Sequence, residues 1–242
     1  MRDLSSILSG VDESWKGVLR DSFEAFEDEY LEYILKSDDF FPDRDNFLNA
    51  FKTLPLDKTR YILFGQDPYP RYESAIGYAF IDGKVEKIFS DKGLSKEVNR
   101  ATSLRNFIKM LLLCEGILDK KELTQEKIAS IDKKEFCSDI ICLKNNFEKN
   151  GVLLLNMALI FSSKEKSGYH LKKWKKFIER VLENIKDRNI TLILLGNASK
   201  EIEKMDVSKE FKKEIFPHPY NLSFIENDEV HRLFGPMHLL RA

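Results

Sequence analysis

Apolar residues recur along the chain at two spacings, one typical of amphipathic helices and one typical of buried strands. Helical spacing over residues 14–36 predicts one long helix, whose inward face consists of Val18, Phe23, Phe26, Tyr30, Tyr33 and Ile34. The same spacing predicts helices over residues 45–54, 103–117 and 171–185, and a further helix that begins with Asn197 as its N-cap. Short apolar runs predict four strands, over residues 60–65, 76–82, 151–156 and 190–196.

The alternation of apolar strands with helices indicates an α/β fold. We expect a single domain over residues 1–242, with a three-layer α/β/α architecture and a central, mostly parallel four-stranded sheet. In such sheets, ligands bind at the carboxyl ends of the strands. Polar residues lie at three places of this kind, which are Gly65-Gln66-Asp67, Asn156 and the loop of residues 216–224. Residues far apart in the sequence are therefore expected to converge on one pocket.

The composition is that of an ordinary soluble protein, with 43% hydrophobic and 33% charged residues and a net charge of −1. The first ten residues lack an apolar segment long enough for a signal peptide, and no run approaches the roughly 18 apolar residues of a membrane span. We therefore expect a cytoplasmic protein in a reducing compartment. The three cysteines, Cys114, Cys137 and Cys142, form no paired metal motif and are expected to be buried free thiols.

The charges are distributed unevenly along the chain. Residues 1–45 contain five Lys or Arg and thirteen Asp or Glu, a net charge of −8. Residues 151–176 contain six Lys and one Glu, a net charge of +5. A basic segment is typical of a nucleic-acid-binding face, but lysines on a solvated helix give the same pattern. Charge alone leaves both interpretations open.

The stretch GQDPYP (residues 65–70) follows the first strand and puts a carboxylate, Asp67, on a loop that prolines restrict on both sides of Tyr69. Together with Ala79-Phe80, VLLLN (152–156) and HPYNLS (218–223), it resembles the uracil-DNA glycosylases of the GQDPY type. The resemblance implies a monofunctional DNA repair enzyme that hydrolyses the N-glycosidic bond of uracil in DNA and leaves an abasic site. It also implies that no metal or other cofactor is needed.

Two residues of these motifs match the chemistry of breaking the bond between sugar and base. The transition state resembles an oxocarbenium cation leaving a uracil anion, and a carboxylate near the sugar stabilises the cation and orients the attacking water. Asp67 occupies the family's position for this carboxylate, although an Asp-Pro pair is also common in ordinary turns. His218 matches the family's histidine, whose neutral N–H donates a hydrogen bond to uracil O2, although an isolated histidine in such a loop is commonly a surface residue.

Four further residues match the family's uracil-binding pocket. The amide of Asn156 can accept a hydrogen bond from uracil N3–H and donate one to O4, whereas cytosine presents the opposite pattern. Phe80 would stack on the base, Tyr69 would exclude the methyl group of thymine, and the backbone of Gln66 would line the pocket. Without the resemblance, Asn156 is simply the end of a strand and Phe80 a core residue.

Three residues match the family's contacts with the DNA strand. Leu222 corresponds to the wedge that fills the space left by the flipped base, and Ser103 and Ser223 correspond to phosphate contacts. Ser103 is equally well explained as a helix N-cap and Ser223 as a loop hydroxyl. The expected partner is uracil-containing DNA, single- or double-stranded. We expect a monomer with no membrane partner.

The chain departs from the family's pattern near the loops that face DNA. Pro70 stands where most members have histidine, Tyr220-Asn221 replace a Ser-Pro pair, and the family's Ser-His pair has a loose counterpart in SGYH (residues 167–170). Two other functions stay open, a catalytically silent glycosylase-like module for DNA binding or scaffolding, and a glycosylase for other damaged pyrimidines. The intact motifs favour the uracil-specific enzyme over both.

Overall fold

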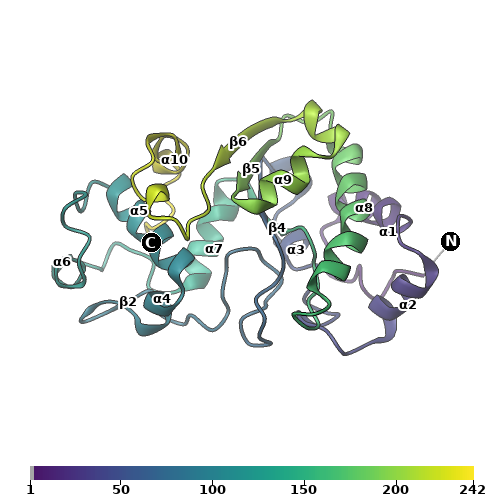
Figure 1. The fold of residues 1–242 in the computed structure, drawn as a ribbon, viewed down its shortest axis with the longest axis horizontal. Helices are drawn as coiled ribbons and strands as arrows, with labels where there is room; N and C mark the ends of the chain where they lie inside the picture. Colours follow the sequence, from purple (N-terminus) through teal and green to yellow (C-terminus); the bar gives the residue numbers. More distant parts are fainter. Residues whose placement is uncertain (1–2) are drawn as a thin grey trace. The chain divides into compact units, whose positions relative to one another are not determined.

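The computed structural model describes residues 3–242, which divide into two compact units (Figure 1). The first unit contains residues up to 80 together with residues 151–214, and the second contains residues 81–150 and 215–242. The single domain expected over residues 1–242 stays a prediction.

A central four-stranded sheet with helices around it confirms the predicted α/β fold. Strand β1 (Tyr61–Gly65) pairs in parallel with β4 (Val152–Asn156) on one side and with β5 (Thr191–Leu195) on the other. The strand order is β4-β1-β5-β6, which places β6 (Lys212–Phe216) at an edge. Three of the four predicted strands are therefore correct, because short apolar runs of this kind are typical of strands that are buried on both faces of a parallel sheet.

The fourth predicted strand, residues 76–82, is wrong. Gly77 and Phe80 have φ angles of +84° and +63°, which lie outside the range of a β-strand. The fourth strand is instead β6, whose sequence KKEIF is too charged to suggest a strand. Charged residues are common on edge strands because they prevent pairing with other chains.

The core of the first unit lies against one face of this sheet. Alternate residues of each strand, with period 2, belong to one cluster of buried side chains that also contains Trp15 and Trp174. These alternate residues are Ile62 and Phe64 in β1, Leu153 and Leu155 in β4, and Leu192 and Leu194 in β5.

The helix predicted over residues 14–36 is two helices, α1 (Glu13–Phe23) and α2 (Asp28–Lys36). Between them, three successive backbone N–H groups bond to carbonyls three residues back, which tightens the chain into a turn. This turn allows Phe26 to stack on Phe177 at 5.6 Å and to meet the ring of Trp174 edge-on at 4.9 Å. Aromatic packing against α8 (Ser167–Ile185) therefore overrides the continuous helical pattern.

The other helices of the first unit agree with the predictions in part. Helix α8 confirms the helix predicted over residues 171–185 and begins about one turn earlier. Helix α3 (Ala50–Thr53) is shorter than the predicted 45–54. Helix α9 (Asn197–Glu203) contains Asn197 as its first helical residue, so Asn197 is not the N-cap. The N-cap is Gly196, whose φ of +58° suits glycine. The short 3-10 helices here are η1 (Leu56–Lys58) and η2 (Asp206–Glu210).

The second unit is mainly helical. Helix α5 (Thr102–Cys114) confirms the helix predicted over residues 103–117, and its Phe107 meets Phe234 of α10 (Asp228–Phe234) at 5.2 Å. A short antiparallel hairpin joins β2 (Phe89–Ser90) to β3 (Gly93–Leu94). The remaining elements are α4 (Lys96–Arg100), α6 (Gln125–Ser130), α7 (Ile140–Lys149), η3 (Leu222–Phe224) and η4 (Gly235–Met237).

The expectation of three free thiols is wrong, because Cys137 and Cys142 form a disulfide. Asp139 is the N-cap of α7, and its carboxylate accepts a hydrogen bond of 2.8 Å from the backbone N–H of Cys142. This turn brings the Cα atoms of the two cysteines to 5.4 Å, which a disulfide can span. Cys114 is free, and burial raises the pKa of its thiol to about 11.

Candidate functional site

Backbone hydrogen bonds join the loops that follow β1 and β4. The N–H of Met157 donates to the carbonyl of Gly65 at 2.9 Å, and the N–H of Ala158 donates to the carbonyl of Gln66 at 3.0 Å. The pairing of the two strands thus continues beyond their last residues. It holds Asp67 and Asn156 at the same carboxyl edge of the sheet, where ligands bind in parallel α/β proteins.

Gly65 is required for space, because its register partner in β4 is Asn156. A Cβ atom on Gly65 would overlap Oδ1 of Asn156 and would lie 3.0 Å from the Cβ of Ala79. The missing side chain therefore makes room for the Asn156 amide, which is 6% exposed. A buried amide held against the backbone of the neighbouring strand is suited to read the hydrogen-bonding edge of a ligand.

The segment before the second unit also reaches this edge of the sheet. The N–H of Ala79 donates to the carbonyl of Leu154 at 3.1 Å, and the hydroxyl of Tyr69 donates to the carbonyl of Phe80 at 3.4 Å. Phe80 has a φ of +63°, a conformation that costs on the order of 1–3 kcal/mol for a residue other than glycine and that clusters at functional sites. Tyr69 and Phe80 are half-buried, and Gln66 is exposed.

The carboxylate of Asp67 has a partner that the sequence did not indicate. The hydroxyl of Ser167, the first residue of α8, donates a hydrogen bond of 2.6 Å to Oδ2 of Asp67. Both side chains are half-buried. The bond joins two residues 100 positions apart, so no local pattern around Asp67 could have revealed it.

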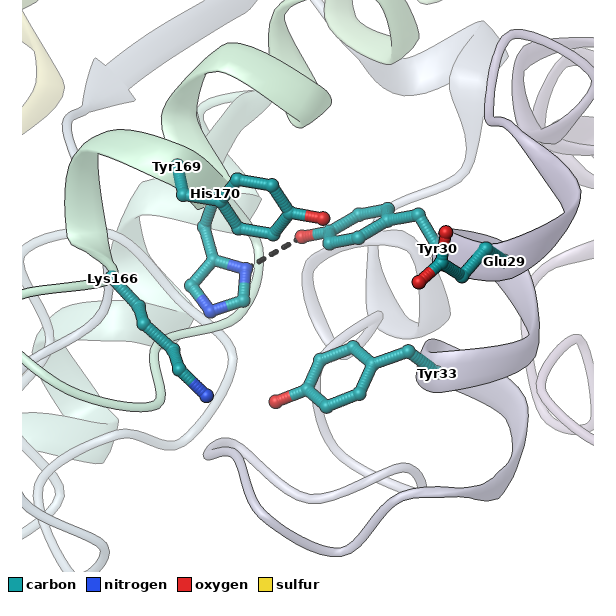
Figure 2. A pocket seen from close by; sticks show the side chains of 6 residues that line it. All are labelled: Glu29, Tyr30, Tyr33, Lys166, Tyr169 and His170. Carbon is teal, nitrogen blue, oxygen red and sulfur yellow. Dashed lines mark hydrogen bonds between the residues drawn. The ribbon is translucent and has the colours of Figure 1, made fainter.

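A hollow of about 370 Å³ lies at the start of α8 (Figure 2). Its walls are mainly aromatic, and Lys166 points its ammonium group toward the hydroxyl of Tyr33. The hydroxyl of Tyr30 bonds to Nδ1 of His170 at 2.7 Å, and the other ring nitrogen bonds to Ser162 at 2.8 Å. The lining residues are Glu29, Tyr30, Tyr33, Lys166, Tyr169 and His170.

In the second unit, the loop after β6 fixes the state of His218. The backbone N–H of Tyr220 donates to Nδ1 of His218 at 3.1 Å, so Nδ1 is an acceptor and the proton of the neutral ring lies on Nε2. Burial lowers the pKa of His218, which keeps the imidazole neutral at pH 7. His218 therefore offers a neutral N–H donor from Nε2.

Asn106, which the sequence motifs do not include, holds this loop in place. Its side chain is buried on α5, and its Nδ2 donates to the carbonyl of Pro219 at 2.7 Å and to that of Tyr220 at 3.3 Å. A buried asparagine on an otherwise apolar helix face is the signal that could have singled it out, since buried polar groups require partners.

The three residues expected to contact DNA lie in the second unit. Leu222 is 72% exposed, while Phe224, two residues later in η3, is fully buried and stacks on Phe107 at 5.7 Å. An anchored turn thus presents an exposed leucine beside Ser223, which is also exposed. Ser103 is half-buried in the first turn of α5, whose N-cap is Ala101, so Ser103 is not the N-cap.

The nine predicted site residues thus fall into two groups. The structure brings Gln66, Asp67, Tyr69, Phe80 and Asn156 together in the first unit, whereas His218, Leu222, Ser223 and Ser103 belong to the second. Within residues 3–242 there is no group of three or more His, Cys, Asp or Glu side chains that could hold a metal ion. No helix in the same range has both the length and the apolar character needed to cross a membrane.

A parallel sheet with a carboxylate and a buried amide at the ends of neighbouring strands is typical of α/β proteins that bind ligands at the carboxyl ends of their strands. The chain belongs to the uracil DNA glycosylase superfamily, whose family model matches residues 51–239.

Individual relatives agree with this assignment. The chain is 27% identical over 225 residues to the uracil-DNA glycosylase of Fusobacterium nucleatum, covering 88% of this chain and 84% of that protein. It is 29% identical over 226 residues to the uracil-DNA glycosylase of Clostridioides difficile, covering 86% and 82%. Its structure resembles the crystal structure of the wild-type UNG from Nitratifractor salsuginis, with a TM-score of 0.97 and 50% identity over 100% of this chain and 99% of the other.

Proposed function

We propose that this protein hydrolyses the N-glycosidic bond of uracil in DNA, releasing uracil and leaving an abasic site for base-excision repair. The observation that carries the proposal is the joined end of β1 and β4. There Gly65, which has no side chain, makes room for the buried amide of Asn156. The carboxylate of Asp67 follows Gly65 by two residues. Such an enzyme needs an amide that recognises the base by hydrogen bonds and a carboxylate that stabilises the positive charge on the sugar.

The base is recognised by four residues of the first unit. The Asn156 side chain accepts a hydrogen bond from uracil N3–H and donates one to O4. Cytosine is rejected because its reversed pattern leaves buried polar groups unpaired. The ring of Phe80 stacks on the base, and the ring of Tyr69 lies at the C5 edge, where thymine has a methyl group. The backbone of Gln66 lines the same pocket.

Asp67 acts on the sugar and on water. As the bond between C1′ and N1 breaks, its electron pair leaves with uracil as an anion, and positive charge develops on the sugar. The carboxylate stabilises this charge and orients a water molecule whose oxygen bonds to C1′. The water proton passes to Asp67, which leaves a hydroxyl group on C1′. Uracil regains a proton from solvent after it departs.

His218 stabilises the departing uracil. The N–H at Nε2 donates a hydrogen bond to O2, where the negative charge develops, and a neutral donor is sufficient for this. The hydrogen bond from Tyr220 to Nδ1 supports this role, because it fixes the tautomer that puts the proton on Nε2. No lysine of the motifs is placed to attack the sugar, so we expect no strand cleavage.

The remaining residues act on the DNA strand. The exposed side chain of Leu222 fills the space that the flipped base leaves, and Ser223 and Ser103 bind phosphates. The substrate is uracil-containing single- or double-stranded DNA, and the protein acts as a monomer in the cytoplasm. The disulfide between Cys137 and Cys142 is uncommon in a reducing compartment and is not needed for this chemistry.

Release of free bases from three matched oligonucleotides tests the function. The oligonucleotides differ at one position, which is uracil, cytosine or thymine, and the released base is quantified by chromatography. We expect uracil alone to be released. A catalytically silent binding module releases no base from any of the three, and a glycosylase of relaxed specificity releases more than one. Either result contradicts the proposal.

A further inference from the structure

Ser167 occupies an unusual position for a serine at the start of a helix. Serine near a helix N-terminus commonly accepts a hydrogen bond from a backbone N–H of the first turn. Helix α8 has no side-chain cap of this kind, and the Ser167 hydroxyl instead donates to Oδ2 of Asp67 at 2.6 Å. That length is typical of a hydroxyl that donates to an ionised carboxylate, which is among the stronger hydrogen bonds in proteins.

Hydrogen bonds of His170 also hold the first turn of α8, which contains Ser167. His170, three residues later, is 1% exposed, and one of its ring nitrogens bonds to Tyr30 of α2 at 2.7 Å (Figure 2). The other ring nitrogen bonds to Ser162 at 2.8 Å. Burial, together with the nearby Lys166 ammonium, lowers the pKa of His170 to about 4, so the ring stays neutral and satisfies one donor and one acceptor. The first turn of α8 is thereby held between α2 and the loop after β4.

We propose that Ser167 is a positioning residue, which holds Oδ2 of Asp67 so that Oδ1 is directed to the attacking water. This inference rests on the role proposed above for Asp67. The terminal torsion of an aspartate is broad and two-fold, so a carboxylate without such a bond can rotate. A bond from a rigid helix turn removes that freedom before the substrate arrives, which is the preorganisation that a cofactor-free hydrolase needs.

Ser167 could instead be purely structural, tying α8 to the loop after β1. The two roles differ in whether the effect of removing Ser167 depends on the carboxylate of Asp67. A positioning residue acts through Asp67, so its removal matters only while the Asp67 carboxylate is present. A structural residue affects folding and all contacts of the site, whether or not Asp67 is a carboxylate.

Single-turnover excision of uracil from a duplex oligonucleotide, with enzyme in excess, separates these roles. Ser167→Thr and Ser167→Val place nearly the same shape at this position and differ in the hydroxyl group. We expect Thr to stay within about threefold of the wild-type rate constant, and Val and Ala to lose about tenfold, the scale of one hydrogen bond to a charged group. The enzyme concentration at half-maximal rate should change less than about twofold. Ser163→Ala, which removes a neighbouring hydroxyl that accepts from the N–H of Lys166, should have no effect.

A double-mutant cycle completes the test. In an Asp67→Asn background, Ser167→Val should change the remaining rate constant less than about twofold, because the two residues act as one unit. Equal rates for the Thr and Val variants, or a tenfold loss that persists in the Asp67→Asn background, would overturn the positioning role while the wild type still excises uracil. A wild-type protein that releases no uracil would overturn the proposed function and this inference with it.

Discussion

At the scale of single residues, the proposed chemistry is divided between the carboxylate of Asp67 and the imidazole of His218. In the proposed mechanism, Asp67 stabilises the positive charge on the sugar, and His218 stabilises the negative charge on the leaving base. Each is held before substrate binds, Asp67 by the hydroxyl of Ser167 and His218 by the backbone N–H of Tyr220. Fixed groups of this kind stabilise a transition state without reorganising during the reaction.

Asp67→Asn and His218→Ala should each lower the single-turnover rate constant by roughly two orders of magnitude or more, the scale for losing a preorganised charge-stabilising group. Binding of uracil-containing DNA should decrease much less than turnover. Gel-shift titrations and single-turnover kinetics on the same oligonucleotide measure the two effects. Near-normal rate constants in both variants would contradict the assigned roles.

Tyr69→Ala should gain weak excision of thymine while it retains some uracil activity. The ring of Tyr69 is expected to exclude the C5 methyl group, and a rigid wall resists overpacking strongly. The gain should stay modest, because the hole also misplaces the base relative to Asp67. Tyr69→Phe is the matched control, since it keeps the ring and removes the hydroxyl that bonds to the Phe80 carbonyl. An unchanged ratio of thymine to uracil release in a folded Ala variant would show that Tyr69 merely packs the turn.

Leu222→Ala should impair double-stranded substrates more than single-stranded ones. In a single strand no duplex stack holds the base, so a wedge contributes less. Leu222 is 72% exposed, so its removal should leave the melting temperature nearly unchanged. Rate constants on matched single- and double-stranded oligonucleotides test this. Equal losses on both would mean that another residue of the loop, such as the exposed Tyr220, acts as the wedge.

At the scale of elements, the sequence predicts the buried parts of the fold well and the strained parts poorly. Strands β1, β4 and β5 follow from their apolar runs. The segment IGYAFID looks like an alternating strand, but the positive φ angles of Gly77 and Phe80 depend on tertiary contacts that no local pattern encodes. The break between α1 and α2 has the same origin, because it is Phe26 packing on α8 that stops the helix.

Some residues of the candidate site could likewise be predicted from the sequence, and others could not. Residues at strand ends, such as Asp67 and Asn156, could be found from the sequence because strands and motifs coincide there. The hydrogen bonds of Ser167 and Asn106 could not be predicted, because the partner of each lies at least 100 residues away. Only the apolar surroundings of Asn106 on α5 could have singled that residue out. The disulfide was missed because a spacing of five residues between Cys137 and Cys142 matches no common motif.

Gly65→Ala tests whether the missing side chain of Gly65 is needed to place the Asn156 amide at the ends of β1 and β4. The new methyl group would overlap the Asn156 amide, so that amide must move, and we expect uracil excision to fall at least a hundredfold, on the scale of misplaced contact residues. Gly17→Ala is the control, since Gly17 lies inside α1 and the added carbon would meet nothing within 4 Å beyond the backbone of its own helix. It should keep full activity and raise stability by about 0.5–1 kcal/mol. Full activity in Gly65→Ala would contradict the proposed geometry.

At the scale of the whole molecule, the residues that we propose for the reaction are distributed over both compact units. Those proposed for base recognition and for the carboxylate belong to the first unit, and those proposed to stabilise the leaving group and to contact DNA belong to the second. The basic segment of residues 151–176 belongs to the first unit, but Lys173 and Lys175 form ion pairs with Glu27 and Glu201. Part of the positive charge of this segment is therefore paired with carboxylates of the protein itself.

We expect the chain's own residues to excise uracil without a metal ion and without breaking the DNA strand. The most direct measurement incubates the protein with an end-labelled, uracil-containing oligonucleotide in EDTA and sizes the products before and after alkali, with Asp67→Asn alongside. We expect intact DNA before alkali, cleavage at the uracil position after alkali, and roughly a hundredfold slower reaction in the variant. The proposed mechanism is wrong if the DNA stays intact after alkali, if it breaks before alkali, or if activity is lost in EDTA and restored by a divalent ion.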